Sequence, residues 1–202
     1  MAGWTEHKGK AVVLGESNID TDQLIPARFM SASRDNGYGD FLLYDVRRDA
    51  EGELMPDFPL NTNADASILI AGRNFGSGSS REAAVYALVD AGFQVVVATS
   101  FGDIFLNNAV NNGLLPAILS EADFKQLTED ADNGSDIRID LDSRSIITNG
   151  HEINFAIDES HRIKLINGWD DIDLTLAHNQ KIDEFKRSRK ITATWTRPQA
   201  VI

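Results

Sequence analysis

ASILIAGRNFGSGSSREAAVYALVDAGFQVVVA, residues 66–98, contains two apolar runs of strand length separated by a glycine-rich loop and a helix-like segment. The first run is residues 66–72. The second, residues 93–98, is continuous and rich in β-branched side chains, which is typical of a strand covered on both faces. Two such strands joined by a helix form a βαβ unit with parallel strands. The stretch therefore predicts an α/β domain.

The segment between the two strands has the spacing of a helix. Small apolar side chains recur there at i, i+3, i+4 and i+7, namely at Ala84, Ala87, Leu88 and Ala91. Gly92 follows, and a glycine just past a helix is a common stop. The alternation continues with a helix-like segment at residues 101–113 and an apolar run at residues 114–119. We therefore expect strand, helix, strand, helix, strand over residues 66–119.

Three segments outside this unit have simple interpretations. AVVLG, residues 11–15, is expected to be a short buried strand. Residues 31–65 are rich in Gly, Asp, Asn and Pro, and a connection of this length is usually a lid or a binding segment. A surface helix is expected after residue 119, with Ser120 as its N-cap and Asp123 at its third position.

Beyond that helix the pattern changes to an antiparallel one. Residues 135–157 alternate apolar and polar side chains, and Asn149 and Gly150 separate two strand-like runs. Asn-Gly between such runs predicts a hairpin with a type I′ turn. Residues 170–190 have a helical pattern, with basic side chains at the end that suit the helix dipole. The tail, residues 190–202, is expected to be an extra strand or an arm of one single domain, residues 1–202.

The composition excludes several classes of function. The chain has 202 residues, of which 42% are hydrophobic and 25% charged, with a net charge of −12. Nucleic acids and anionic membranes are poor partners for such a chain, because phosphate binding needs a basic face. No window approaches the roughly 20 apolar residues of a membrane span. The first 15 residues also lack the apolar stretch of a signal peptide, so we expect a cytoplasmic protein.

Metal ligands are scarce in the sequence. There are no cysteines, which excludes disulfides and a cysteine-ligated iron–sulfur cluster or zinc site on this chain. The four histidines do not pair at metal-ligand spacing. We therefore expect this chain to hold no metal or cofactor of its own.

The glycine-rich loop GRNFGSGSSREAA, residues 72–84, has two interpretations. In the structural one, Gly76 and Gly78 allow a tight turn with positive φ. Ser79 and Glu82 then fit a capping box, S-x-x-E, at the start of the helix. Such strand–loop–helix joints are common in α/β proteins.

In the functional interpretation the same loop binds an anion. A loop entering a helix exposes backbone N–H groups, and the helix dipole adds positive potential there. Arg81 adds a planar, permanently charged fork that suits a carboxylate. The loop matches neither a P-loop nor a dinucleotide fingerprint. A small carboxylate substrate is therefore favoured over a nucleotide.

Three stretches together resemble the small subunit of 3-isopropylmalate dehydratase, of the aconitase superfamily. They are NIDTDQLIPARFM at residues 18–30, GRNFGSGSSREAAVYALVDAGFQVVVATSFGDIFLNNAVNNGLLPAIL at residues 72–119 and NGWDDIDLTL at residues 167–176. The resemblance implies the swivelling β/β/α domain of the aconitase type, an α/β fold with a mixed, barrel-like sheet flanked by helices. Residues 31–65 would then be a long active-site loop.

The resemblance also implies roles for single residues. Ser79 matches the serine that acts as the base and removes a proton from the carbon next to a carboxylate. Arg81 matches the arginine that holds a substrate carboxylate and steadies the serine alkoxide. The remaining matches are to substrate-binding or loop-shaping positions. They are Ser80, Asp22, Arg34, Asn74 and Gly76, and Asp22 could equally be an ordinary turn acid.

By the same resemblance, the partner is a separate large subunit that carries a [4Fe–4S] cluster. The complex would interconvert 2-isopropylmalate and 3-isopropylmalate in leucine biosynthesis. Two departures leave the substrate open, because many relatives have Cys where this chain has Ser77 and His where it has Ala83. A related hydro-lyase acting on another diacid, of the citraconate, methylmalate or aconitate type, is one alternative. A non-catalytic anion-binding module is another.

Overall fold

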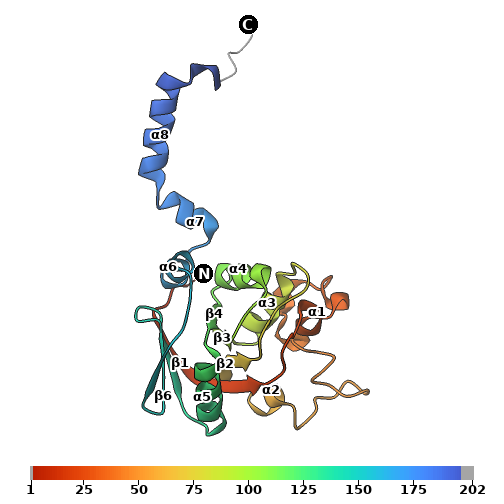
Figure 1. Cartoon of the computed structure of the whole chain (residues 1–202). Helices are drawn as coiled ribbons and strands as arrows, with labels where there is room; N and C mark the ends of the chain where they lie inside the picture. Colours follow the sequence, from red (N-terminus) through yellow and green to blue (C-terminus); the bar gives the residue numbers. More distant parts are fainter. Residues whose placement is uncertain (1, 197–202) are drawn as a thin grey trace.

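The computed structural model describes residues 2–196. Its core is one seven-stranded mixed sheet with the strand order β4-β3-β2-β1-β5-β6-β7 (Figure 1). The parallel half is formed by β1 (Glu6–Leu14), β2 (Ala66–Ala71), β3 (Val95–Ala98) and β4 (Leu115–Ile118). Helices α3 (Ala83–Asp90) and α4 (Asp103–Asn111) connect β2 to β3 and β3 to β4. The predicted alternation over residues 66–119 is confirmed.

The first strand is longer than the sequence predicts. Only residues 11–15 were expected, whereas β1 begins at Glu6. Its first half pairs antiparallel with β5, and its second half pairs parallel with β2, with a register shift between Lys10 and Ala11. Residues 6–10 are polar and are alternately exposed and half-buried. A strand with one solvent-exposed face lacks a continuous apolar run, and such a run is the signal that identifies the buried second half of β1.

The antiparallel half is a meander of three strands, β5 (Ile137–Asp140), β6 (Ser145–Thr148) and β7 (His151–Asn154). Asn149 and Gly150 form the two-residue loop between β6 and β7, with φ values of 45° and 79°. Positive φ at both central residues is the requirement of a type I′ turn, so the predicted hairpin is confirmed.

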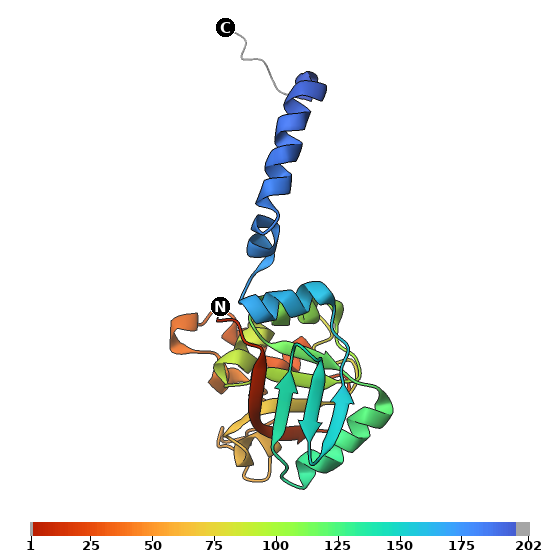
Figure 2. The same ribbon diagram turned by 90° about the vertical axis from the view of Figure 1, so that its left-hand side faces the viewer.

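The sheet curls until its two edges meet. Ile118, at the end of β4, and Ala156, just past β7, exchange two backbone hydrogen bonds of 2.8 and 3.3 Å. Figure 2 shows the antiparallel strands wrapped against the parallel ones with helices outside. This is the mixed, barrel-like sheet with flanking helices that the sequence resemblance implies.

Both faces of the parallel strands are buried. Along β2, Ile68 and Ile70 pack into the cluster shared with the antiparallel half, whereas Leu69 and Ala71 pack against α3 and the N-terminal loops. Val95 to Ala98 of β3 alternate in the same way and are all fully buried. Alternation between two apolar cores explains why these strands read as continuous apolar runs.

The helices and loops around the sheet agree with the sequence in part. α5 (Glu121–Asp132) is capped by the Ser120 hydroxyl, which accepts the N–H of Asp123 as predicted. After α1 (Thr21–Leu24) and η1 (Ala27–Phe29), the regular structure in residues 31–65 is short. It consists of η2 (Arg34–Asn36), η3 (Gly39–Phe41), α2 (Pro59–Thr62) and a bridge between Arg48 and Leu54. The long segment is nevertheless packed onto the body, because it buries Tyr38, Leu42, Leu43 and Leu60.

The C-terminal region projects away from the body as an arm (Figures 1 and 2). After α6 (Glu159–Asn167) the predicted helix of residues 170–190 is broken into α7 (Asp171–Leu176) and α8 (Asn179–Thr192), followed by η4 (Thr194–Thr196). Neither α7 nor α8 buries a residue. Of the tail predicted at residues 190–202, the end of α8 and η4 form part of this arm, and residues 197–202 lie outside the described part. No helix within residues 2–196 has both the length and the apolar character needed to cross a bilayer.

The base of the arm is held by a buried lysine. Lys164 of α6 is 5% exposed, and its Nζ donates to Asn111 of α4 at 3.0 Å and to the Asp171 carboxylate of α7. The hydrogen bond from Lys164 holds the pKa of Asp171 below its ordinary value. A charge removed from water needs such partners. This contact therefore fixes where the arm leaves the body.

Candidate active site

The glycine-rich loop lies at the carboxyl ends of the parallel strands and is bonded to two neighbouring loops. The N–H of Gly76 donates to the Ile19 carbonyl at 2.8 Å, and the N–H of Thr21 donates to the Ser77 carbonyl at 2.9 Å. The N–H of Phe75 donates to the Ser100 carbonyl at 3.1 Å. In α/β proteins, whether the parallel sheet is open or closed into a barrel, ligands bind at the carboxyl ends of the strands. Loops after β1, β2 and β3 thus converge on one place.

Two glycines permit the close approach of these loops. Gly76 and Gly78 have φ values of 69° and 104°, as predicted. A Cβ at position 76 would lie 2.2 Å from the Phe105 ring, and one at position 78 would lie 3.3 Å from Thr21 Oγ1. The loop can therefore lie against α4 on one side and α1 on the other only with glycine at these positions.

The predicted capping box is wrong. Helix α3 begins at Ala83, its N-cap is Glu82, and no side chain caps it. Ser79 is bonded elsewhere, because its N–H donates to Thr21 Oγ1 at 3.2 Å and its carbonyl accepts the N–H of Arg81 at 2.8 Å. The hydrogen bonds to Thr21 of α1 hold Ser79 outside the helix. The Ser79 hydroxyl is thereby left free of a capping role.

Ser79 and Ser80 are both exposed. The Ser79 Oγ lies 3.2 Å from Thr21 Oγ1, and either atom can be the donor. Within residues 2–196 neither the Ser80 hydroxyl nor the N–H groups of Ser80, Glu82 and Ala83 are hydrogen-bonded. The Glu82 carboxylate accepts from Asn112 at 2.9 Å. Free N–H groups at a helix start, with the dipole behind them, attract an anion.

Arg81 and Asp22 form an ion pair across the two loops. The Arg81 side chain is 22% exposed and the Asp22 side chain 59%. The pair uses one amino group of the guanidinium. A guanidinium has five N–H donors, so others remain for a ligand carboxylate. The sequence separated these residues by 59 positions, and the fold places them beside Ser79.

Asn74 shapes the loop. It has a φ of 58°, its N–H donates to Ser100 Oγ at 2.8 Å, and its side-chain amide donates to Asn18 Oδ1 at 2.9 Å. Asn tolerates this left-handed conformation better than most residues. Asn74 therefore bridges the loops that follow β1, β2 and β3.

Arg34 is not brought to Ser79. Its guanidinium lies 3.6 Å from the centre of the Tyr86 ring and 3.6 Å from Asp90 Oδ1. Both partners belong to α3, and Asp90 is the last residue of that helix. The structure thus gathers Ser79, Arg81, Asp22 and the loop containing Asn74 and Gly76, and it holds Arg34 farther along the helix.

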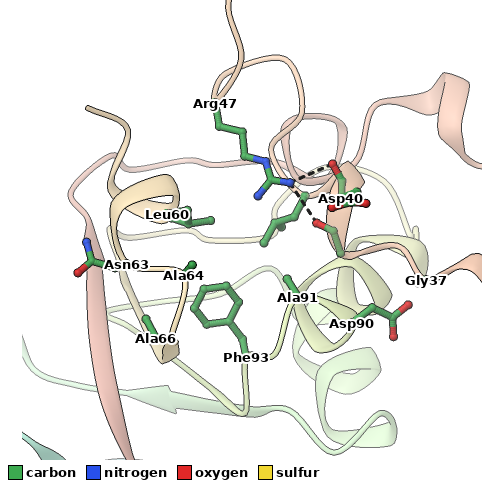
Figure 3. Close-up of a pocket in the computed structure, with 12 residues that line it drawn as sticks. Gly37, Asp40, Arg47, Leu60, Asn63, Ala64, Ala66, Asp90, Ala91 and Phe93 are labelled. Carbon is green, nitrogen blue, oxygen red and sulfur yellow. Dashed lines mark hydrogen bonds between the residues drawn. The ribbon is translucent and has the colours of Figure 1, made fainter. Parts of the chain in front are cut away.

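A cleft of about 380 Å³ lies at the opposite end of α3 (Figure 3). Leu42, Leu60 and Phe93 supply apolar lining, and Arg47 reaches in from above. Arg47 donates to the carbonyls of Asp40 and Gly39 at 3.0 and 3.4 Å. Burial and the nearby Arg48 lower the pKa of Arg47. None of the site residues predicted from the sequence lines this cleft.

Sequence reasoning missed one residue of the site, Thr21. Thr21 is 1% exposed. Its Oγ1 accepts the N–H of Ser79 and lies within hydrogen-bond distance of the Ser79 carbonyl oxygen and of Ser79 Oγ. The sequence signal was its position directly before Asp22 in the stretch NIDTD. A threonine 58 residues from Ser79 can be linked to it only when the two loops are seen together.

The residues around the loop do not fit a metal cluster on this chain. The chain has no cysteine, and no group of three His, Asp or Glu side chains within residues 2–196 is placed to bind a metal ion. The arrangement instead offers a hydroxyl, a guanidinium and free N–H groups, which suit a small carboxylate.

Comparisons with known proteins identify this arrangement. The family described as the aconitase C-terminal domain matches residues 1–122. The 3-isopropylmalate dehydratase small subunit of Shouchella clausii is 48% identical over 183 residues, covering 89% of this chain and 93% of that protein. The protein of the same name from Bacillus subtilis is 45% identical over 187 residues, covering 91% and 94%.

The chain belongs to the 3-isopropylmalate dehydratase small-subunit family. A crystal structure of 3-isopropylmalate dehydratase from Methanocaldococcus jannaschii has the same fold, with a TM-score of 0.65 at 27% identity, covering 90% of this chain and 99% of that one. In the chain described here, the match to the aconitase C-terminal domain includes both the glycine-rich loop and the loop that contains Asp22. The predicted family and fold are therefore confirmed.

Proposed function

We propose that this chain is the small subunit of a 3-isopropylmalate dehydratase, which interconverts 2-isopropylmalate and 3-isopropylmalate by dehydration and rehydration in leucine biosynthesis. The observation that carries the proposal is the family membership together with the Ser79–Ser80–Arg81 group at the carboxyl edge of the sheet. The similarity to subunits of a biosynthetic enzyme supports a cytoplasmic location.

In this proposal Ser79 is the base. Its hydroxyl is exposed, is not used to cap α3, and can point toward a substrate carbon. A serine oxygen removes a proton only where its anion is stabilised. The neighbouring Thr21 hydroxyl, the Arg81 guanidinium and the helix start all favour the anionic form. Ser79 thus takes the proton from the carbon next to a substrate carboxylate.

Arg81 and the free N–H groups bind the substrate carboxylate. As the proton leaves the carbon, negative charge builds up on that carboxylate, and donors already in place offset it. Ser80 adds a hydroxyl that makes no hydrogen bond within residues 2–196. The Asp22 carboxylate orients the Arg81 guanidinium through their ion pair.

The rest of the site belongs to a partner. We propose that a large subunit holds the [4Fe–4S] cluster, since this chain has no cysteine to supply thiolates. Ser79 and Ser80 are exposed here, and charge stabilisation of the kind described needs exclusion of water. The large subunit would cover them, and the loop of residues 31–65 would border the enclosed site.

A reconstitution experiment tests the proposal. The purified chain alone is expected to have no hydratase activity and to gain it on addition of the large subunit with an intact cluster. Activity is measured on 2-isopropylmalate, 3-isopropylmalate, citraconate, a methylmalate and aconitate. Turnover of the isopropylmalates at the highest kcat/KM supports the proposal. Activity of the isolated chain would contradict the division of the site, and preference for another diacid would contradict the substrate.

A further inference from the structure

Thr21 contacts three hydrogen-bonding atoms of Ser79, which the sequence does not predict. Its Oγ1 lies 3.2 Å from the Ser79 hydroxyl oxygen, 3.2 Å from the Ser79 carbonyl oxygen and 3.2 Å from the Ser79 nitrogen. At 1% exposure, Thr21 has almost no contact with water, whereas Ser79 is exposed. The buried Thr21 hydroxyl therefore contacts the exposed Ser79 residue from the protein interior.

The position of Thr21 is fixed by its backbone. It is the first residue of α1, after Asp20, which caps that helix by accepting the N–H of Gln23 at 2.8 Å. The Thr21 N–H donates to the Ser77 carbonyl at 2.9 Å, and the Thr21 carbonyl accepts the N–H of Ile25. With both backbone groups bonded, only the hydroxyl proton is free to change partner.

That proton has two acceptors. The Ser79 N–H donates to Thr21 Oγ1, so the oxygen already accepts one bond. The hydroxyl proton can then be directed to the Ser79 carbonyl or to the Ser79 Oγ. While Ser79 is a neutral hydroxyl, both oxygens can accept, and the carbonyl is the stronger of the two neutral acceptors. When Ser79 is an alkoxide, its oxygen is the stronger acceptor, because bonds to charged acceptors are the stronger ones.

We propose that Thr21 is the positioning residue for Ser79, and that its hydroxyl turns from the Ser79 carbonyl to the Ser79 oxygen when that oxygen is anionic. No proton leaves Thr21 in this step. The inference rests on the proposed function, because it assumes that Ser79 is the base. It adds that the loop after β1 supplies a buried donor to the exposed Ser79 hydroxyl.

The test compares Thr21→Val, which removes the hydroxyl at similar shape, with Thr21→Ser, which keeps it, in the reconstituted complex. Turnover is followed with substrate carrying hydrogen or deuterium on the carbon that loses its proton. For Thr21→Val, kcat is expected to fall by about tenfold or more, with KM changed by less than about twofold. The deuterium isotope effect on kcat is expected to rise, because proton removal becomes slower than the other steps. Thr21→Ser is expected to recover kcat to within about threefold.

A control variant separates positioning from general loop stability. Ser100→Ala removes another hydroxyl that holds the same loop, through the N–H of Asn74, and does not touch Ser79. It is expected to lower thermal stability and leave the isotope effect at the wild-type value. An isotope effect that rises equally in Ser100→Ala and Thr21→Val would assign the effect to the loop and overturn the proposal.

Other outcomes also decide the question. Wild-type kcat and isotope effect in Thr21→Val would overturn the inference, as would a Thr21→Ser variant as slow as Thr21→Val. If Thr21→Val does not assemble, Thr21→Ala makes the same comparison, and failure of both to assemble would give Thr21 a role in folding only. A wild-type complex without isopropylmalate turnover would contradict the proposed function itself. A working wild type with an inactive Ser79→Ala and a normal Thr21→Val would contradict only the present inference.

Discussion

The two ends of helix α3 differ in the exposure of their side chains, in the presence of a cleft and in the pairing of their arginines. At the N-terminal end lie Ser79, Ser80 and Arg81, to which the proposed function assigns the chemistry, and the serines are exposed. At the C-terminal end, Asp90 and Ala91 border a cleft of about 380 Å³ with a mixed polar and apolar lining and a half-buried arginine. This cleft is not lined by the residues that match the family motif. An active site shared between two subunits need not be concave on either one alone.

The charges at the two ends are arranged differently as well. Arg81 pairs with the Asp22 carboxylate and keeps other N–H donors for a ligand. Arg47 is held by two backbone carbonyls, and burial lowers its pKa. Helix dipoles favour anions at the N-terminal end and disfavour them at the other. The comparison predicts that substitutions at the first end affect turnover far more than substitutions at the second.

The largest effect is expected for Ser79→Ala. Removal of the base should lower kcat of the complex by about a thousandfold or more. The Ser79 N–H and carbonyl would keep their bonds to Thr21 and Arg81, so fold and partner binding should persist. Steady-state kinetics and size-exclusion chromatography measure both. The matched variant at the other end, Arg47→Gln, should keep kcat within about twofold. Near-normal kcat in Ser79→Ala would remove Ser79 from the mechanism.

A smaller but still large loss is expected for Arg81→Lys. An ammonium keeps the charge but cannot reproduce the two-pronged contact with a carboxylate while also pairing with Asp22. We expect kcat/KM of the complex to fall by about a hundredfold, or about 2.7 kcal/mol of transition-state stabilisation. Unchanged kcat/KM in this variant would show that only the charge at position 81 matters.

The smallest of the three effects concerns stability. In Gly76→Ala the new Cβ would meet the Phe105 ring at 2.2 Å, and the backbone would be held at a φ of 69°. Crowding and the left-handed conformation together should cost about 2 kcal/mol of the free energy of unfolding. For a chain of this size that lowers Tm by about 4–8 °C.

Gly52→Ala is the matched control for this prediction. Gly52 also has a positive φ, 88°, but a Cβ there would meet nothing within 4 Å. Its Tm should fall only by the backbone part, about half as much. Both Tm values are measured by thermal unfolding. Equal decreases in Tm in the two variants would mean that the Phe105 ring moves to accommodate the new Cβ, and that close packing does not fix the loop.

Most of the fold could be predicted because its signals are local. The continuous apolar runs of β2 and β3, the Asn149–Gly150 turn and the Ser120 cap each depend on residues near in sequence, and each is confirmed. The first half of β1 was missed because one face of it is exposed to solvent, so its side chains are polar and do not form a continuous apolar run. The break between α7 and α8 was missed because the helical pattern runs through it without a glycine or proline.

The site shows the same division. From the sequence alone, the glycine loop, its positive φ angles and the acid-binding character of Arg81 follow from residue chemistry, and the family motif names Ser79. Only the tertiary structure shows that Ser79 does not cap the helix, that Asp22 and Thr21 lie beside it, and that Arg34 packs against Tyr86 and Asp90 of α3. The physical reason is that conformational preferences act between neighbouring residues. Hydrogen bonds between loops, by contrast, depend on the curvature of the sheet that brings distant residues together.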